Sequence, residues 1–137
     1  MKYMILSYAS QRDYDEMVGK TDGAAPVWSP EDFANMAQFM GAFNERLADS
    51  GELVETRGLL DPARTRRVAA GPTPVVTDGP YAETEEVLAG YWIVECESLD
   101  RATAIAAELN DCPAPEAARA RAYADVRPIA EDHADLG

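Results

Sequence analysis

Apolar and polar positions recur along the chain with two periods, one typical of strands and one typical of helices. Strand-like runs rich in apolar and β-branched residues occupy residues 2–8, 53–60, 89–97 and 123–129. The clearest is the run over 89–97, in which Trp92 and Val94 face one way while Tyr91 and Ile93 face the other. Because both sides of this strand are apolar, we expect both faces of its sheet to be covered.

The first helix is predicted from residue spacing and from its ends. Ser29 is its capping residue, the helix begins at Pro30, and Ser50 and Gly51 end it. Asn44 lies on its apolar side, so we expect the amide to make an internal hydrogen bond. The apolar positions follow three- and four-residue steps, which gives a single stripe at Phe33, Met36, Ala37, Met40, Phe43 and Leu47.

A second helix is capped by Ser98 and must end before Pro113. The Ala-rich stretch that follows, residues 113–122, predicts a short helical turn. By contrast, residues 9–28 are polar and contain several turn-forming residues, so they are predicted to be a long surface loop, and long loops are often functional.

Between the strands predicted at residues 53–60 and 89–97, the chain is predicted to form a hairpin and a sharp corner. Residues 66–70 and 74–77 read as the two hairpin strands, and the prolines in their connection indicate the edge of a sheet. The corner follows at Asp78, Gly79 and Pro80. Here Gly can adopt a positive φ and Pro prevents a helix from starting, so the next strand must leave in a new direction.

The order of these elements predicts an α+β fold, a ferredoxin-like βαββαβ unit with an added hairpin. Residues 1–130 are expected to form one domain and residues 131–137 an acidic, frayed tail. Two helices cover only one face of such a sheet, and the open face would expose a large apolar patch unless a second copy covered it. We therefore predict a homodimer that buries Tyr3, Ile5, Tyr91 and Ile93.

Composition and charge exclude several classes of partner. The 137 residues carry 25 acidic and 12 basic side chains, a net charge of −13, which repels nucleic acid and anionic lipid surfaces. No apolar run is long enough for a signal peptide or a membrane span, so a cytoplasmic protein is expected. The two cysteines do not form a disulfide framework; Cys96 is interpreted as a small buried hydrophobe and Cys112 as a loop thiol.

Several sequence blocks resemble the YCII-related family, and in particular its DGPF subgroup. They are Lys2 to Leu6, Val76 to Glu86, Gly90 to Glu95, Ser98 to Ala102 and Val126 to Ile129. The resemblance implies a dimeric α/β barrel. Tyr81 stands where the subgroup usually has Phe, which keeps the ring and adds a hydroxyl. DGPF proteins are also often encoded beside extracytoplasmic-function sigma factors, which implies a regulatory or accessory role as an alternative to small-molecule binding.

Some YCII-like proteins resemble muconolactone-processing enzymes and carry a His near the start of the first helix, paired with an Asp as an acid–base dyad. This chain departs from that pattern, because its helix starts with Ser29 to Phe33 and its one His is His133. A zinc site or a Ser or Cys triad lacks the necessary residues, and we expect neither a metal nor another cofactor.

The carboxylates and tyrosines near the corner are the remaining candidates for chemistry. Asp78 is the candidate catalytic residue, because a carboxylate held at a turn can act as a general acid or base. Tyr8, Asp32, Tyr81 and Glu83 are the candidate ligand-binding residues, in a pocket between sheet and helices beside the corner. The structural alternative is that Asp78 only binds backbone N–H groups of its own turn. Whether the protein is an enzyme, a binding protein or an interaction module is left open.

Overall fold

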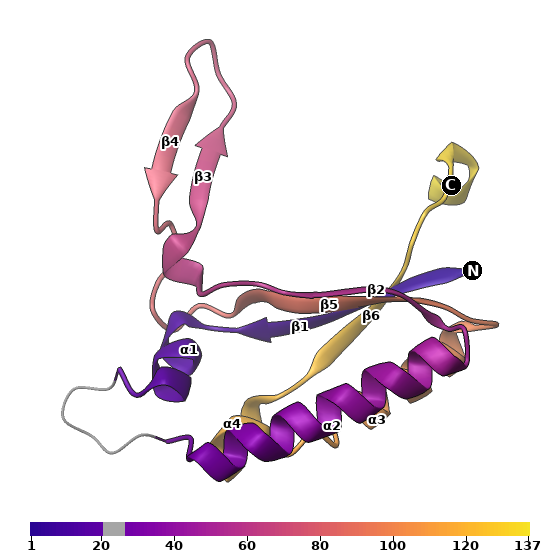
Figure 1. Cartoon of the computed structure of the whole chain (residues 1–137). Coiled ribbons are helices and arrows are strands. Elements are labelled where there is room, and N and C mark those ends of the chain that lie inside the picture. The colour runs from indigo at the N-terminus through magenta and orange to yellow at the C-terminus, as the bar shows by residue number, and fades with distance from the viewer. Residues whose placement is uncertain (21–26) are drawn as a thin grey trace.

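A computed structural model describes residues 1–20 and 27–137 of the chain (Figure 1). Its elements, in order, are β1 (Lys2–Ala9), α1 (Gln11–Val18), α2 (Pro30–Asp49), β2 (Leu53–Gly58), η1 (Pro62–Arg64), β3 (Arg66–Ala69), β4 (Val75–Asp78), β5 (Val87–Glu95), α3 (Leu99–Leu109), α4 (Glu116–Arg121), β6 (Ala124–Pro128) and η2 (His133–Leu136), where η marks a 3-10 turn.

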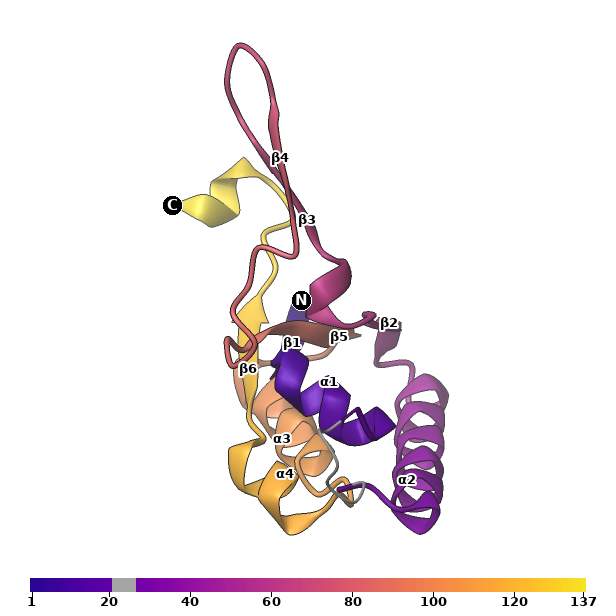
Figure 2. The same cartoon turned by 90° about the vertical axis from the view of Figure 1, so that its left-hand side faces the viewer.

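Four strands form one antiparallel sheet in the order β2-β5-β1-β6, while β3 and β4 pair only with each other. Helices α2 and α3 lie on one side of the sheet, and the β3–β4 hairpin and the C-terminal segment rise from the other (Figures 1 and 2). This is the ferredoxin-like α+β fold with an added hairpin, which confirms the predicted fold class. Within the described residues, no helix has both the length and the apolar character that crossing a bilayer requires.

The core lies between the sheet and the two long helices. Ile5 of β1, Val94 of β5, Phe43 of α2 and Ile105 of α3 are fully buried there. Asn44 accepts a hydrogen bond from the indole Nε1 of Trp92 at 2.9 Å, so the predicted internal partner of this amide is confirmed. The bond ties α2 to the central strand next to the core.

The faces of the first strand differ from the prediction. Tyr3 and Ile5 are buried under the helices, because they lie opposite Val94 and Trp92 in the ladder and opposed residues share a face. The uncovered side, which we call the open face, therefore contains Met4, Leu6, Tyr91 and Ile93. Both faces of β1 are apolar in sequence, so its pattern alone could not decide between them.

The predicted loop over residues 9–28 is wrong in its first half, because Gln11–Val18 is helix α1. Ser10 and Asp13 form a capping box, and Gly19 ends the helix with φ 75°. None of the residues of α1 is buried, which explains the missing apolar stripe. The part of the predicted loop over 21–26 lies outside the described residues.

At the corner, Gly79 adopts the positive φ, 55°, that its sequence predicts. Its N–H donates to the carbonyl of Thr65 at 2.8 Å, which fastens the end of the hairpin to its beginning. The residues after the corner form a hydrogen-bonded turn rather than a helix, with the Glu85 N–H donating to the Ala82 carbonyl. The chain then enters β5 at Val87, so the corner separates two different sheets.

A half-buried ion pair connects the start of β2 to α3. Arg101 donates from Nε and Nη2 to the two carboxylate oxygens of Glu52, each at 2.8 Å. These hydrogen bonds from Arg101 hold the pKa of Glu52 below its ordinary value. The pair lies where α2 ends and α3 begins, because the Glu52 N–H also donates to the Leu47 carbonyl at 2.9 Å and Arg101 is in the first turn of α3.

This ion pair predicts an acid-sensitive contribution to stability. The folded-state pKa of Glu52 is lowered, so its contribution is present above the unfolded-state pKa and is lost as the pH falls through the folded-state pKa. Between about pH 6 and about pH 3, urea unfolding should therefore lose more free energy in the wild type than in Glu52→Gln. Glu45→Gln, on the exposed side of α2, is the control and should retain the wild-type acid dependence. Identical acid dependence in Glu52→Gln would contradict this role.

Candidate functional site

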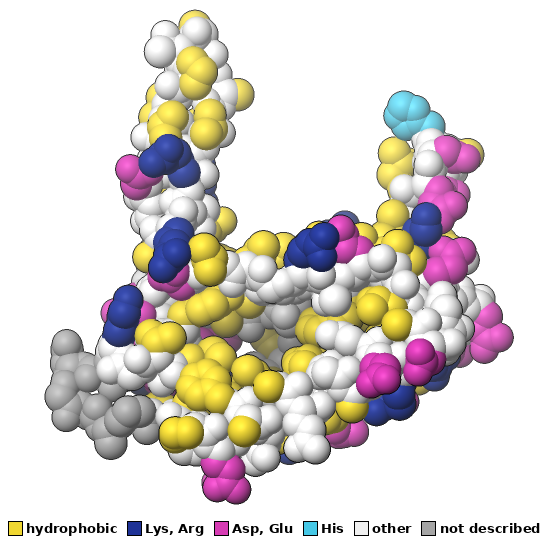
Figure 3. Space-filling model, viewed as in Figure 1, with side chains coloured by type: hydrophobic (Ala, Val, Ile, Leu, Met, Phe, Trp, Pro, Cys, Tyr) yellow, Lys and Arg dark blue, Asp and Glu magenta, His cyan; other side chains and the backbone are white. Residues whose placement is uncertain are grey.

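A cavity of about 270 Å³ lies between the sheet and the helices. Figure 3 shows the corresponding face hollowed between the sheet and α2, with hydrophobic side chains around the opening. We call this space the apolar lobe. Its main apolar side chains come from five different elements and one connecting segment: Met17, Trp28, Met36, Met40, Trp92, Leu109 and Ala118.

The apolar lobe exists because only part of α2 packs closely on the sheet. Phe43 and Leu47, both in its C-terminal half, are its buried residues, whereas Met36 and Met40 remain partly exposed. Trp28 fixes the entry to the helix: it precedes the Ser29 cap and packs on Phe33, with ring centroids 5.2 Å apart. This is a hydrophobic staple. It places a buried indole at the side of the cavity.

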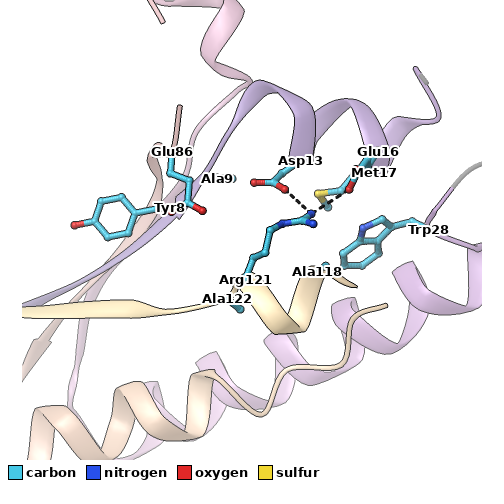
Figure 4. A pocket seen from close by; sticks show the side chains of 10 residues that line it. All are labelled: Tyr8, Ala9, Asp13, Glu16, Met17, Trp28, Glu86, Ala118, Arg121 and Ala122. Carbon is cyan, nitrogen blue, oxygen red and sulfur yellow. Dashed lines mark hydrogen bonds and ion pairs between the residues drawn. The ribbon is translucent and has the colours of Figure 1, made fainter. Parts of the chain in front are cut away.

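A second space of about 140 Å³, the charged lobe, adjoins the first (Figure 4). Both are lined by Tyr8, Met17, Trp28, Ala118 and Ala122. The charged lobe adds Asp13 and Glu16 from α1, Arg121 from α4 and Glu86 from the turn before β5.

Arg121 is the centre of the charged lobe. Its Nη2 lies 2.7 Å from Asp13 Oδ1 and 3.1 Å from Glu16 Oε2, and Figure 4 shows these contacts bridging α4 and α1. Partial burial acts to raise the pKa of Asp13, but hydrogen bonds from the Ser10 backbone and from Arg121 outweigh it and the pKa is lowered. The Asp13 carboxylate is thus ionised at neutral pH and paired with Arg121.

Two stacked tyrosines stand beside the lobes. The rings of Tyr8 and Tyr123 are 5.3 Å apart, and the Tyr123 hydroxyl donates to Glu86 at 2.8 Å. This hydrogen bond raises the pKa of Tyr123. Burial, followed by the nearby Asp125 carboxylate, raises the pKa of Tyr8. Both phenols therefore stay protonated at neutral pH and act as hydrogen-bond donors rather than as bases.

The apolar lobe also contains a thiol, Cys112, in the connection between α3 and α4. Burial raises its pKa, so the thiol is protonated at neutral pH and is a weak nucleophile. Within residues 1–20 and 27–137, no group of three or more His, Cys, Asp or Glu side chains is arranged to hold a metal ion. The cavity is suited to binding an apolar body next to polar donors.

Comparison with known proteins places this architecture in a family. Residues 1–130 match the model of the YCII-related domain. The chain belongs to the YCII-related family. It is also similar to an uncharacterised protein of Rhizobium meliloti (strain 1021), with 33% identity over 92 residues that cover 66% of this chain and 73% of that protein.

In this YCII-related domain, the residues predicted at the corner do not meet in one cavity. Asp78 is exposed and its carboxylate accepts from Arg66 Nε at 2.8 Å, across the β3–β4 ladder. Within the described residues, the Asp78 carboxylate makes this one hydrogen bond. The structural alternative, in which Asp78 binds the N–H groups of its own turn, is therefore wrong. Neither lobe includes Asp78.

The predicted ligand-binding residues are distributed over different parts of the domain. Tyr81 packs under Arg67, whose guanidinium carbon is 5.4 Å from the ring centroid. Glu83 has an exposed side chain, and its carbonyl accepts from the Arg12 N–H at the start of α1. Asp32 completes the α2 capping box by accepting from the Ser29 N–H at 2.8 Å. Tyr8 alone among them lines the two lobes.

Sequence reasoning missed the residues that give the lobes their character. Trp28 could have been found, because an aromatic residue directly before a capping Ser and a second one at Phe33 is the pattern of a hydrophobic staple. Met17 lies on α1, and Arg121 of α4 pairs with α1, so the place of both in the lobes depends on that helix. The sequence signal of α1 was the spacing of Ser10 and Asp13, which form its capping box. Cys112 has no local signal, since its place in the cavity depends on how α4 packs.

The exposed Asp78–Arg66 pair predicts a small effect of substitution. Its side chains are 78% and 70% exposed, and solvent-exposed pairs contribute at most about 1 kcal/mol. Asp78→Asn should therefore change the free energy of unfolding in urea by less than about 1 kcal/mol. Gly79→Ala is the comparison: it places a Cβ on a backbone with φ 55° and should cost about 1–2 kcal/mol. A larger loss for Asp78→Asn than for Gly79→Ala would contradict this description of the corner.

Proposed function

We propose that this YCII-related protein binds a small, mainly apolar molecule in the apolar lobe, with its polar end directed to the charged lobe. The observation that carries the proposal is the apolar cavity of about 270 Å³ beside the sheet. Its size is close to that of small-molecule sites, which are typically apolar with a few placed polar groups. The ligand does not need to displace the core, because Phe43, Val94 and Ile105 lie outside the lobe.

The walls favour a flat or flexible hydrocarbon body. Trp28 and Trp92 offer aromatic surfaces, and the methionines adapt their shape to different ligands. The charged lobe is closed by the Arg121 ion pairs with α1, so a strongly charged ligand would compete with these pairs. A neutral polar group that hydrogen-bonds to the lobe without replacing them is therefore favoured.

Catalysis by Asp78 and membership of the DGPF subgroup are separate predictions. The Asp78 carboxylate lies outside the lobes, so an acid–base role would require a substrate at the hairpin. A regulatory role linked to a sigma factor is likewise an expectation of the family resemblance. Loss of turnover in Asp78→Asn with unchanged cavity binding would support the catalytic role.

A large side chain that fills the apolar lobe should weaken ligand binding. Ala118 lines both lobes, so Ala118→Trp should fill the space and reduce the binding of N-phenyl-1-naphthylamine, an apolar fluorescent probe, by about tenfold or more. Ala117→Trp places the same side chain at an exposed position of α4 and should bind the probe like the wild type. Fluorescence titration measures both, and thermal melting checks folding. Equal binding by both variants would contradict the cavity proposal.

The thiol of Cys112 provides an independent readout of occupancy. Probe in the apolar lobe should slow alkylation of Cys112 by a neutral maleimide, as followed by mass spectrometry in a Cys96→Ala background. Ala118→Trp should also slow alkylation, without probe. An alkylation rate unaffected by saturating probe would indicate that the probe binds elsewhere on the protein.

We further propose that two copies pair through their open faces. Met4, Leu6, Tyr91 and Ile93 form the apolar centre of this face. The Tyr91 hydroxyl donates to Glu55 at 2.9 Å at one edge, and Asp125 and Arg127 lie at the other edge on β6. An apolar centre with a polar rim is the usual anatomy of a protein interface.

A charge in the centre of the open face should separate the copies. Ile93→Glu places an unpaired carboxylate in the proposed interface, where burial without a partner is costly. Light scattering at micromolar concentration should give about twice 14.9 kDa for the wild type and about 14.9 kDa for Ile93→Glu. Ala104→Glu, on the exposed side of α3, should keep the wild-type mass. A monomeric wild type would refute the homodimer.

A further inference from the structure

The base of the β3–β4 hairpin forms a groove that the proposed function does not use. It has a volume of about 500 Å³ and is lined mainly by apolar groups, among them Leu59, Leu60, Pro62, Tyr81, Val87 and Leu88. Leu60 is 70% exposed and Leu59 is 43% exposed. Exposure of this kind at a concave site indicates a surface that another polypeptide covers.

Positive charge lies at the wall of this groove. Arg64 is one of its lining residues, and Arg67 lies over the ring of Tyr81. Arg64 pairs with Asp61, whereas within the part of the chain that the structure describes no carboxylate lies within ion-pair distance of Arg67. Residues 61–80 contain three arginines and two aspartates, a local surplus of one positive charge in a chain of net charge −13.

The C-terminal segment, residues 131–137, has the complementary character. It contains Glu131, Asp132 and Asp135, and its Leu136 is 71% exposed. The structure gives this segment as the 3-10 turn η2, in which Asp132 accepts from the Ala134 N–H at 2.7 Å. The turn presents one leucine among acidic side chains in a preformed shape, which lowers the entropic cost of docking.

The segment cannot reach the groove of its own chain. The hairpin and the C-terminal segment rise from the same side of the sheet but at opposite ends (Figures 1 and 2). Strand β5, with nine residues, separates these ends by about 30 Å. Residues 131–137 would span at most about 25 Å even if fully extended. An occupant with this chemistry must therefore come from a second copy.

We propose that the C-terminal segment of one copy docks in the hairpin groove of the other, with Leu136 in the apolar groove and the acidic side chains near Arg67. The inference rests on the proposed pairing of open faces. Two such faces can pair with their strand directions arranged in two ways. One brings the acidic segments of both copies together, which is repulsive; the other brings each acidic segment to the groove beside Arg67. Charge therefore selects the second arrangement.

Crosslinking of the full chain tests the contact directly. In a Cys96→Ala, Cys112→Ala background, one preparation carries Leu60→Cys and another carries Leu136→Cys. After mixing and exchange, a short bismaleimide should yield a covalent dimer that contains both chains, as identified by mass spectrometry. A parallel pair with Leu136→Cys and Leu99→Cys, which places the second thiol on the helix side at α3, is the matched control and should remain uncrosslinked.

A second measurement uses no cysteines. Leu136→Ser and Arg67→Glu should each raise the dimer dissociation constant by about tenfold or more in analytical ultracentrifugation, because a two-fold dimer loses the contact twice. Leu99→Ser, a change of another exposed leucine, should leave the constant unchanged. Glu131→Lys should partly restore affinity in the Arg67→Glu background, and it leaves unchanged Asp132 and Asp135, whose side chains hold η2.

The outcomes separate this inference from the dimer itself. A wild-type dimer with the mixed crosslink and weakened Leu136→Ser pairing supports the docking. The docking is overturned if the wild type is a dimer but Leu136→Ser and Arg67→Glu do not weaken it and no mixed crosslink forms. That result would leave the pairing of open faces intact. Crosslinking of Leu136→Cys only to itself overturns the proposed strand arrangement. A monomeric wild type overturns both proposals.

Discussion

The antiparallel pairing of β1 with β5 is the constraint on which the rest of the domain depends. It places Ile5 opposite Trp92 and Leu6 opposite Tyr91, and the alternation of strand side chains assigns the paired residues to one face or the other as far as the register shift between Ser7 and Tyr8. A slip by one residue would turn Tyr3 and Ile5 toward solvent. The register therefore defines both the helix-covered core and the open face, and with them the two surfaces from which the binding proposals are argued.

On the covered side, the same register leaves a cavity because the helices are not equally attached. α3 buries residues along its length, from Ala102 to Leu109, whereas α2 buries only Phe43 and Leu47. The Trp92–Asn44 hydrogen bond lies at the boundary between the packed and the separated half of α2. Closing the gap would bury more apolar surface and add stability. Leaving it open leaves the apolar lobe, which is bounded by α1 and α4, and these two helices are connected by the Arg121 ion pairs.

The sequence was sufficient for elements with strong periodic signals. The capped α2, the second long helix, the central strand and the positive φ of Gly79 all follow from local residue chemistry, and so does the α+β class. It was insufficient where a decision depends on tertiary packing. The short helix α1 buries no residue and so has no stripe, and the two apolar sides of β1 could not be distinguished. At the corner, the turn motif predicts a backbone conformation but not what its side chains face, so the functional role of Asp78 stays a prediction.

The β3–β4 hairpin depends both on local residue chemistry and on tertiary packing. Strands β3 and β4 pair only with each other, and their residues Val68, Val75 and Val76 are all more than half exposed. An isolated two-stranded hairpin is marginal in water, and here the Gly79–Thr65 hydrogen bond and the Arg66–Asp78 pair hold only its base. In the proposed docking, a second copy would pack on the groove at this base and stabilise the hairpin. In that arrangement the Asp78 corner would support the hairpin as an interaction arm, because Tyr81, which follows the corner, lines the groove and has Arg67 over its ring.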